Sequence, residues 1–224
     1  GDATDADTET VSRRIVAGSA TGQDPQPLLS VLAERQNADG GYGGGPGYSS
    51  AALDTAWALL AQAQAGQGSS PAALQARQWL ASRVQLAGPL AGALQDTPGT
   101  RAASSAVRLY TTALASLALQ TGSDTASTQT VPLITNWLAA QQGSDGGWNS
   151  DTLVSAWVLL AVAPVSTDTG LKNAAHTFLQ TRQAADGSWG GDPYITAVAL
   201  RALTARASPS GNGSLNGQVL DAST

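Results

Sequence analysis

The stretch Gln141–Val162, QQGSDGGWNSDTLVSAWVLLAV, decides how this chain folds. It predicts the end of one helix, a tight Asp-Gly-Gly turn, a buried aromatic residue at Trp148 and a second, strongly apolar helix. Asp-Gly suits a turn that needs a positive φ, and the aromatic residue after it can fill the seam between two helix pairs. The stretch therefore predicts one helical hairpin of a repeat.

The same hairpin occurs three times clearly and a fourth time in worn form. Three copies carry the turn, and their candidate fastening residues are Gln36, Asp39 and Tyr42, then Gln142, Asp145 and Trp148, then Gln183, Asp186 and Trp189. In the remaining copy a longer loop over residues 86–100 replaces the turn. The period is about 41 to 43 residues for the last two copies, which is typical of stacked helical hairpins.

The second helix of each hairpin carries a hydroxyl residue followed by alanine. The four pairs are Thr55-Ala56, Thr112-Ala113, Ser155-Ala156 and Thr196-Ala197. Small residues let helices approach closely, and the hydroxyl can bond back to carbonyls of its own helix. These helices are also the more apolar ones, so we expect them to form an inner layer. A solenoid and a ring both fit. We predict an all-α, α/α-toroid-like arrangement of about four hairpins in a partial or small ring.

The composition divides the chain into three parts. Residues 1–24 form an acidic, polar N-terminal extension, residues 25–207 hold the repeats, and residues 208–224 form a Gly/Ser-rich extension. Within this extension, residues 215–220 fit either one short strand or the beginning of a further domain. By composition the first part is a flexible tail, and the alternative is a tail docked onto its own domain or a neighbouring subunit.

Charge and sulfur content narrow the classes of function. From residue 11 onward twelve acids face eleven bases, so no basic surface exists to bind nucleic acid. No apolar run reaches the roughly 18 to 20 residues of a membrane span. The chain has no Cys and no Met, which excludes disulfides and thiolate zinc sites and favours an extracellular or cell-envelope protein.

The turns resemble a known superfamily. Gln142 to Trp148 and Gln183 to Gly190 are similar to the QW-type repeats of squalene–hopene cyclases and of prenyltransferase beta subunits, and Gln36 to Gly43 is similar with Tyr42 in place of Trp. The resemblance covers roughly residues 27–205 and implies an α/α toroid. That superfamily also includes thioester domains and cobalamin carriers. The fold alone does not imply a function.

The catalytic residues of those enzymes have no counterparts in this chain. Hopene-type cyclases protonate an alkene with an Asp-x-Asp-Asp motif, and here the nearest pattern, Asp5-Ala6-Asp7, lies in the expected extension. Prenyltransferases hold zinc through Asp, Cys and His, and the chain has no Cys and only His176, which we expect at the surface. We therefore expect no enzyme activity, no metal and no cofactor.

Five residues are candidates for binding a ligand: Asp54, Trp57, Tyr48, Tyr110 and Trp157. Asp54 stands in an apolar register position, where it either contacts a ligand or caps the loop inserted at residues 44–48. Trp57 and Trp157 recur on the second helices, either in the core or as a platform for a ligand.

The sequence favours a non-catalytic, secreted or cell-surface structural protein. It would engage protein partners, or assemble with itself into an extracellular assembly or filament, through its terminal extensions. The alternative is a carrier that binds a hydrophobic, corrinoid or glycan ligand, and the third hypothesis is a degenerate terpenoid cyclase.

Overall fold

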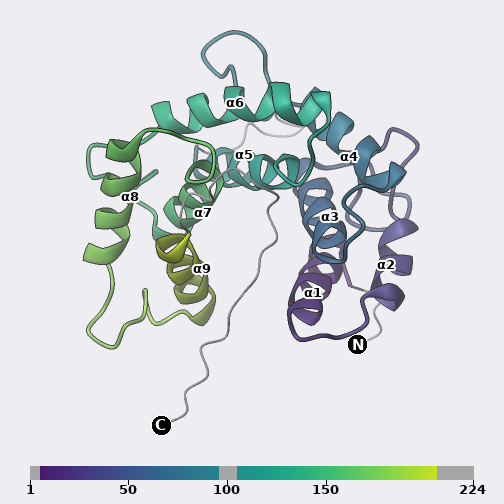
Figure 1. Cartoon of the computed structure of the whole chain (residues 1–224), viewed down its shortest axis with the longest axis horizontal. Coiled ribbons are helices and arrows are strands. Elements are labelled where there is room, and N and C mark those ends of the chain that lie inside the picture. The colour runs from purple at the N-terminus through teal and green to yellow at the C-terminus, as the bar shows by residue number, and fades with distance from the viewer. Residues whose placement is uncertain (1–5, 96–104, 206–224) are drawn as a thin grey trace.

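The computed structural model describes residues 6–95 and 105–205. Within them the chain forms nine helices and no strands (Figure 1). The helices are α1 (Thr8–Ala20), α2 (Gln26–Ala33), α3 (Ala52–Gln64), α4 (Pro71–Ser82), α5 (Ser105–Leu119), α6 (Thr125–Ala140), α7 (Thr152–Val162), α8 (Thr169–Thr181) and α9 (Pro193–Thr204). The predicted strand over 215–220 lies outside the described residues.

The helices form two concentric layers of an open arc (Figure 1). The inner layer is α1, α3, α5, α7 and α9, each packed against the next, and the outer layer is α2, α4, α6 and α8. The arc opens between α1 and α9, so the ring is partial. The prediction of an all-α, α/α-toroid-like fold with the second helices inside is confirmed.

Burial patterns explain which helices lie inside. Every residue of α7 from Val154 to Val162 is buried, because α7 has neighbours on both sides and an outer layer behind it. On the outer helix α8 only Leu171, Ala175, Phe178 and Leu179 are buried, at the three- and four-residue spacing of a one-sided helix. A helix with apolar residues on every side is therefore an inner helix with neighbours on both sides.

The N-terminal region differs from the expectation for residues 1–24. Thr8–Ala20 forms α1, the first helix of the inner layer, with Val11 and Ile15 fully buried against its neighbours. Asp7 caps it, and its carboxylate accepts the backbone N–H of Thr10. The sequence did not predict this helix, because Val11 and Ile15 are only two apolar residues in a mostly acidic and polar segment. Thr8 and Ser12 are also buried, so half of the contact face reads as polar.

The four turns between outer and inner helices share one backbone structure. Four glycines adopt a positive φ between 84° and 96°: Gly40, Gly92, Gly146 and Gly187. Each lies two residues before a buried side chain that fills the seam between hairpins, called the plug residue below: Tyr42, Leu94, Trp148 and Trp189. The expectation that the second hairpin lacks the turn is wrong: Gly92 and Leu94 take the places of Gly40 and Tyr42, and Val84 bridges Leu94 as Gln36 bridges Tyr42. The missing Asp hid this turn from sequence comparison.

Candidate functional site

The turn residues that we expected to fasten the repeats have defined bonds. Gln36 Nε2 donates to the carbonyls of Gly40 and Ala72, at 3.0 and 2.9 Å, and so ties its own turn to α4. Gln142 Nε2 makes the same pair with Gly146 and Leu171, at 2.8 and 3.0 Å, and ties its turn to α8. Gln183 Nε2 has one bond of this kind among the described residues, to Gly187.

The aspartates of the turns accept backbone N–H groups. Asp39, Asp145 and Asp186 each accept the N–H of the residue two positions later, at 2.9 to 3.0 Å. Backbone bonds to Gly147 and Ser188 hold the pKa of Asp145 and of Asp186 below the usual range. Within the described ranges, no group of three or more Asp, Glu or His residues is arranged to hold a metal ion.

The plug residues fill the seams between hairpins. Tyr42, Trp148 and Trp189 are at most 1% exposed, and the indole N–H groups of Trp148 and Trp189 donate to Leu138 and Leu179. The backbone N–H of each plug residue donates to the recurring hydroxyl: to Thr55 and Thr196 for the first and last hairpins, and to Ser155 at 2.8 Å for the third. Leu94 donates to Thr112 in the same way. This acceptor role explains why a hydroxyl recurs there.

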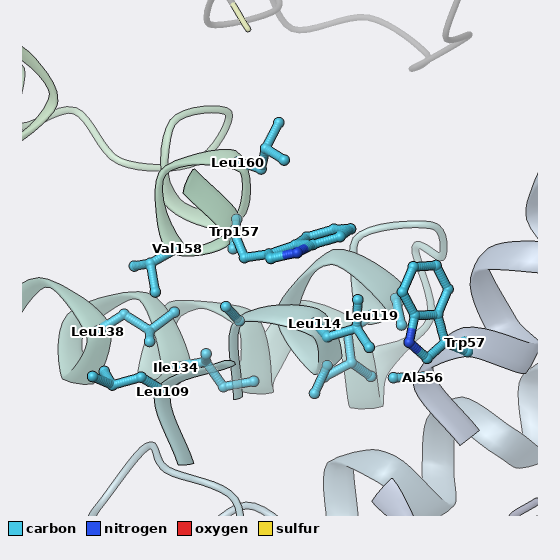
Figure 2. Packing of buried hydrophobic residues seen from close by; sticks show 14 of the residues in the cluster. Ala56, Trp57, Leu109, Leu114, Leu119, Ile134, Leu138, Trp157, Val158 and Leu160 are labelled. Carbon is cyan, nitrogen blue, oxygen red and sulfur yellow. The ribbon is translucent and has the colours of Figure 1, made fainter. Parts of the chain in front are cut away.

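Aromatic side chains from successive inner helices meet at the middle of the arc. The rings of Trp57 and Trp157 lie edge to face with centres 5.7 Å apart, and Tyr110 lies 6.1 Å from Trp157. Figure 2 shows Trp57 and Trp157 extending toward one another from α3 and α7. Such pairs stabilise a fold by about 0.5–1.5 kcal/mol beyond burial.

A guanidinium from α1 completes this group. Arg13 lies over the rings of Trp57 and Tyr194, at 4.6 and 4.9 Å, and it also donates to the Tyr110 hydroxyl at 3.5 Å. Arg13, Trp57, Tyr110, Trp157 and Tyr194 are called the central cluster below. Each of the five inner helices contributes one member, so the tertiary structure alone assembles it.

Asp54 lies one turn from Trp57 on the same face of α3. Burial raises its pKa to about 6, helped by the negative charges of Glu9 and Asp7, while Arg35 opposes the shift. No hydrogen bond to its carboxylate is found among the described residues, and Gly44 of the inserted loop lies beside it. This half-buried carboxyl holds a proton at a higher pH than an ordinary aspartate. Asp7, which we placed in a tail, is part of its surroundings.

The structure thus brings together four of the five candidate ligand residues. Trp57, Tyr110 and Trp157 are in the central cluster and Asp54 lies beside it, while Tyr48 stands apart in its loop and is 70% exposed. Sequence reasoning missed Arg13 and Tyr194. Tyr194 shares its repeat register with Tyr110 and was within reach of internal comparison. No local pattern marks Arg13.

Comparison with known proteins identifies the fold. No protein-family model matches the chain, and no curated protein matches it. A solved structure of a protein from Actinoplanes matches with a TM-score of 0.59 and 21% identity, over 87% of this chain and 64% of that one. The ent-copalyl diphosphate synthase from Streptomyces platensis matches with a TM-score of 0.62 and 21% identity, over 90% of this chain and 41% of that one. The chain spans less than two thirds of either.

The synthase corrects our expectation that the chain is not an enzyme. We excluded catalysis because motifs of hopene-type cyclases and prenyltransferases were absent, yet a protein with this helical arrangement is a synthase by name. The absence of motifs with a fixed spacing does not exclude catalysis, because packing can bring together acidic residues that lie far apart in the sequence, as it brings Asp7 and Glu9 near Asp54. The chain has the α/α-toroid-like fold of the terpene cyclases.

Proposed function

We propose that the chain is a terpenoid-cyclase-like domain that binds an isoprenoid chain beside the central cluster and donates a proton from Asp54. The observation that carries this proposal is the Asp54 carboxyl, half-buried, with a pKa of about 6 and without a hydrogen bond in the described part of the chain. An acid catalyst needs a pKa near the working pH and a free proton to deliver.

The central cluster supports the same proposal through its electrostatics. The faces of aromatic rings attract cations, and protonation of an alkene leaves a carbocation that such faces stabilise. Arg13 demonstrates that the rings of Trp57 and Tyr194 accept a cation between α1 and α9. The side chain of Arg13 is 36% exposed and paired with Glu9. A bound substrate would therefore displace Arg13 toward solvent rather than into the core.

The test uses geranylgeraniol as the probe and two variants of the chain. We expect binding to quench tryptophan fluorescence, because Trp57 and Trp157 border the site, and we expect cyclised products by gas chromatography and mass spectrometry. Asp54→Asn should retain quenching and lose the products. Asp24→Asn, at an exposed carboxyl, should retain both. Undiminished product formation by Asp54→Asn would exclude its role, and absence of quenching in the unaltered chain would exclude the site.

We propose a second function, contact with partner proteins outside the cytoplasm. Two large apolar side chains in loops, Tyr48 at 70% and Leu86 at 79% exposure, support the contact, and the lack of Cys and Met supports the location. Exposed residues of this kind are frequent at interfaces. The test is sedimentation of native complexes with Leu86→Asp, which should weaken association. Unchanged sedimentation would remove this function.

A further inference from the structure

Two buried indoles of the central cluster make no hydrogen bond within the described part of the chain. Trp57 and Trp157 are 5% and 3% exposed, and the nitrogen of each indole is buried without an acceptor. The plug residues Trp148 and Trp189 are buried as deeply, and their N–H groups donate to backbone carbonyls at 2.7 and 2.8 Å. Burying a donor without an acceptor costs free energy, so an unpartnered pair needs a structural or functional reason.

A local reason exists for a third unpartnered indole, that of Trp137 on the outer helix α6. Trp79 packs on the first turn and donates its N–H to Asp39 at 2.8 Å. Trp137 packs on the next turn, at Gly92, where Ala91 stands in the place of the aspartate. The lost aspartate therefore accounts for Trp137. No such substitution accounts for the two indoles on the inner helices.

The rings of Trp57 and Trp157 cannot satisfy each other (Figure 2). Their planes meet at 88° with the centres 5.7 Å apart, so one ring presents its edge to the face of the other. An N–H group on that edge can at most make a weak contact with the π face. The indole that presents its face directs its own N–H elsewhere. At least one N–H of the pair is thus left for an acceptor from outside the pair.

Arg13 and Tyr110 add further donors at the same place. Arg13 donates to the Tyr110 oxygen at 3.5 Å, and its own Nε is buried without a partner in the described ranges. Burial raises the pKa of Tyr110 to about 12, and the indole N–H of Trp57 partly opposes that rise, which places this N–H near the same oxygen. Guanidinium and indole groups only donate, so neither can accept the Tyr110 proton. No hydrogen bond from the Tyr110 hydroxyl is found within residues 6–95 and 105–205.

We propose that the central cluster binds the carboxylate of an amphiphilic acid, an isoprenoid or fatty acid, through Arg13, the Tyr110 hydroxyl and the indole N–H of Trp57. A carboxylate only accepts hydrogen bonds, it has about four lone-pair sites, and its charge is opposite to that of the guanidinium. The aromatic rings supply apolar surface for the hydrocarbon part. The inference rests on the proposed function and adds an anionic end group to the ligand of the same site.

The polar side of the central cluster is open to solvent, where such a ligand can enter. The side chain of Arg13 is 36% exposed and Tyr194 is 38% exposed. Arg13 is paired with Glu9 of its own helix, whose side chain is 30% exposed. Exposed ion pairs of this kind contribute little to stability, so a carboxylate that also binds Tyr110 and Trp57 can replace Glu9. Arg13, turned toward solvent by the hydrocarbon part of the ligand, stays paired with its carboxylate.

Binding of three probes to the full chain tests the end group: geranylgeranoic acid, palmitic acid and geranylgeraniol. Each is added below the concentration at which it aggregates, and quenching of tryptophan fluorescence reports binding. At about pH 7.5 we expect geranylgeranoic acid to bind about tenfold more tightly than geranylgeraniol, because only the acid forms charge-assisted hydrogen bonds. Palmitic acid that binds as tightly as geranylgeranoic acid identifies the ligand as a fatty acid, and weaker binding identifies it as an isoprenoid acid.

The same titrations separate this inference from the proposed function. Equal affinities for geranylgeraniol and both acids overturn the carboxylate site. Quenching by geranylgeraniol alone also overturns it and leaves the proposed function standing. No quenching by any of the three probes overturns both.

Substitutions that remove single donors test which residues bind the carboxylate. Arg13→Gln and Tyr110→Phe should each weaken binding of geranylgeranoic acid about fivefold to tenfold and change binding of geranylgeraniol by less than about twofold. The control is Arg14→Gln, which removes the neighbouring exposed charge of α1 and should change neither affinity. Calorimetry measures these affinities, since the substitutions alter the fluorescence of Trp57, and circular dichroism checks that each variant is helical. Undiminished affinity for the acid in both Arg13→Gln and Tyr110→Phe overturns the proposal, as does an equal loss in Arg14→Gln.

Discussion

The guanidinium of Arg13 lies 4.9 Å from the ring centre of Tyr194, so that the first and last helices of the inner layer contact each other across the opening of the arc. The two residues are separated by almost the whole described chain. An arc held only by neighbouring hairpins could open and close freely at this point. The contact between Arg13 of α1 and Tyr194 of α9 opposes that motion.

Replacing Arg13 with alanine should loosen the arc. We expect Arg13→Ala to lower the free energy of unfolding by about 1–2 kcal/mol, because it loses two ring contacts and the packing of its aliphatic stem. Tryptophan emission should shift to the red as water reaches Trp57. The control is the exposed neighbour Arg14→Ala, for which we expect changes within about 0.5 kcal/mol. Equal effects of the two variants would mean that the ring contacts contribute nothing measurable.

The raised pKa of Asp54 makes stability depend on pH. The folded pKa of about 6 lies above the unfolded value of 3.8, so the folded state binds the proton more tightly. The contribution of Asp54 is then fully favourable below pH 3.8 and is lost as pH rises through about 6. Asp54→Asn removes this loss, and we expect it to be more stable at neutral pH by about 1 kcal/mol, a value reduced for the partial exposure of the group.

The measurement is Tm from about pH 4 to about pH 7.5 for the original chain, Asp54→Asn and Asp24→Asn. The curves for the original chain and for Asp54→Asn should converge at the acidic end and separate toward neutral pH, while Asp24→Asn should run parallel to the original. Curves for Asp54→Asn that stay parallel to the original over the whole range would contradict the raised pKa.

The fastening glutamines should matter in proportion to the bonds they make. Gln142→Ala removes one bond within its turn and one to α8, and we expect a loss of about 1–2 kcal/mol in chemical denaturation. The neighbouring Gln141→Ala changes the same residue type at an exposed position and should cost less than about 0.5 kcal/mol. A cost for Gln141→Ala as large as that for Gln142→Ala would argue against a fastening role.

Glycine at position 146 is required by conformation and by close approach. Gly146→Ala places a Cβ at a positive φ and against the carbonyl of Ala174, so we expect a loss of about 2–4 kcal/mol. Gly66→Ala has a similar φ of 76° with no atom within 4 Å, and should cost only the conformational strain of about 1 kcal/mol. Thermal denaturation of both variants compares them directly. Equal losses of unfolding free energy would show that the close approach of α8 to Gly146 does not contribute to stability.

Sequence alone determined the layers and three of the four turns, because their signals are local. Gln142, Gly146 and Ser155 lie within fourteen residues of one another and hold the same turn together, so their spacing in the sequence predicts that turn. The turn at Gly92 was missed because a positive φ needs only glycine, while the pattern that we sought also needed aspartate.

Only the tertiary structure decided where α1 belongs and what surrounds Asp54. The burial of Val11 and Ile15 depends on helices that come later in the chain, and the pKa of Asp54 depends on charges of Glu9 and Asp7 brought to it by packing. The central cluster likewise takes one residue from each inner helix. Such groups have no sequence spacing of their own, because contacts across an arc are set by the rotation from one hairpin to the next.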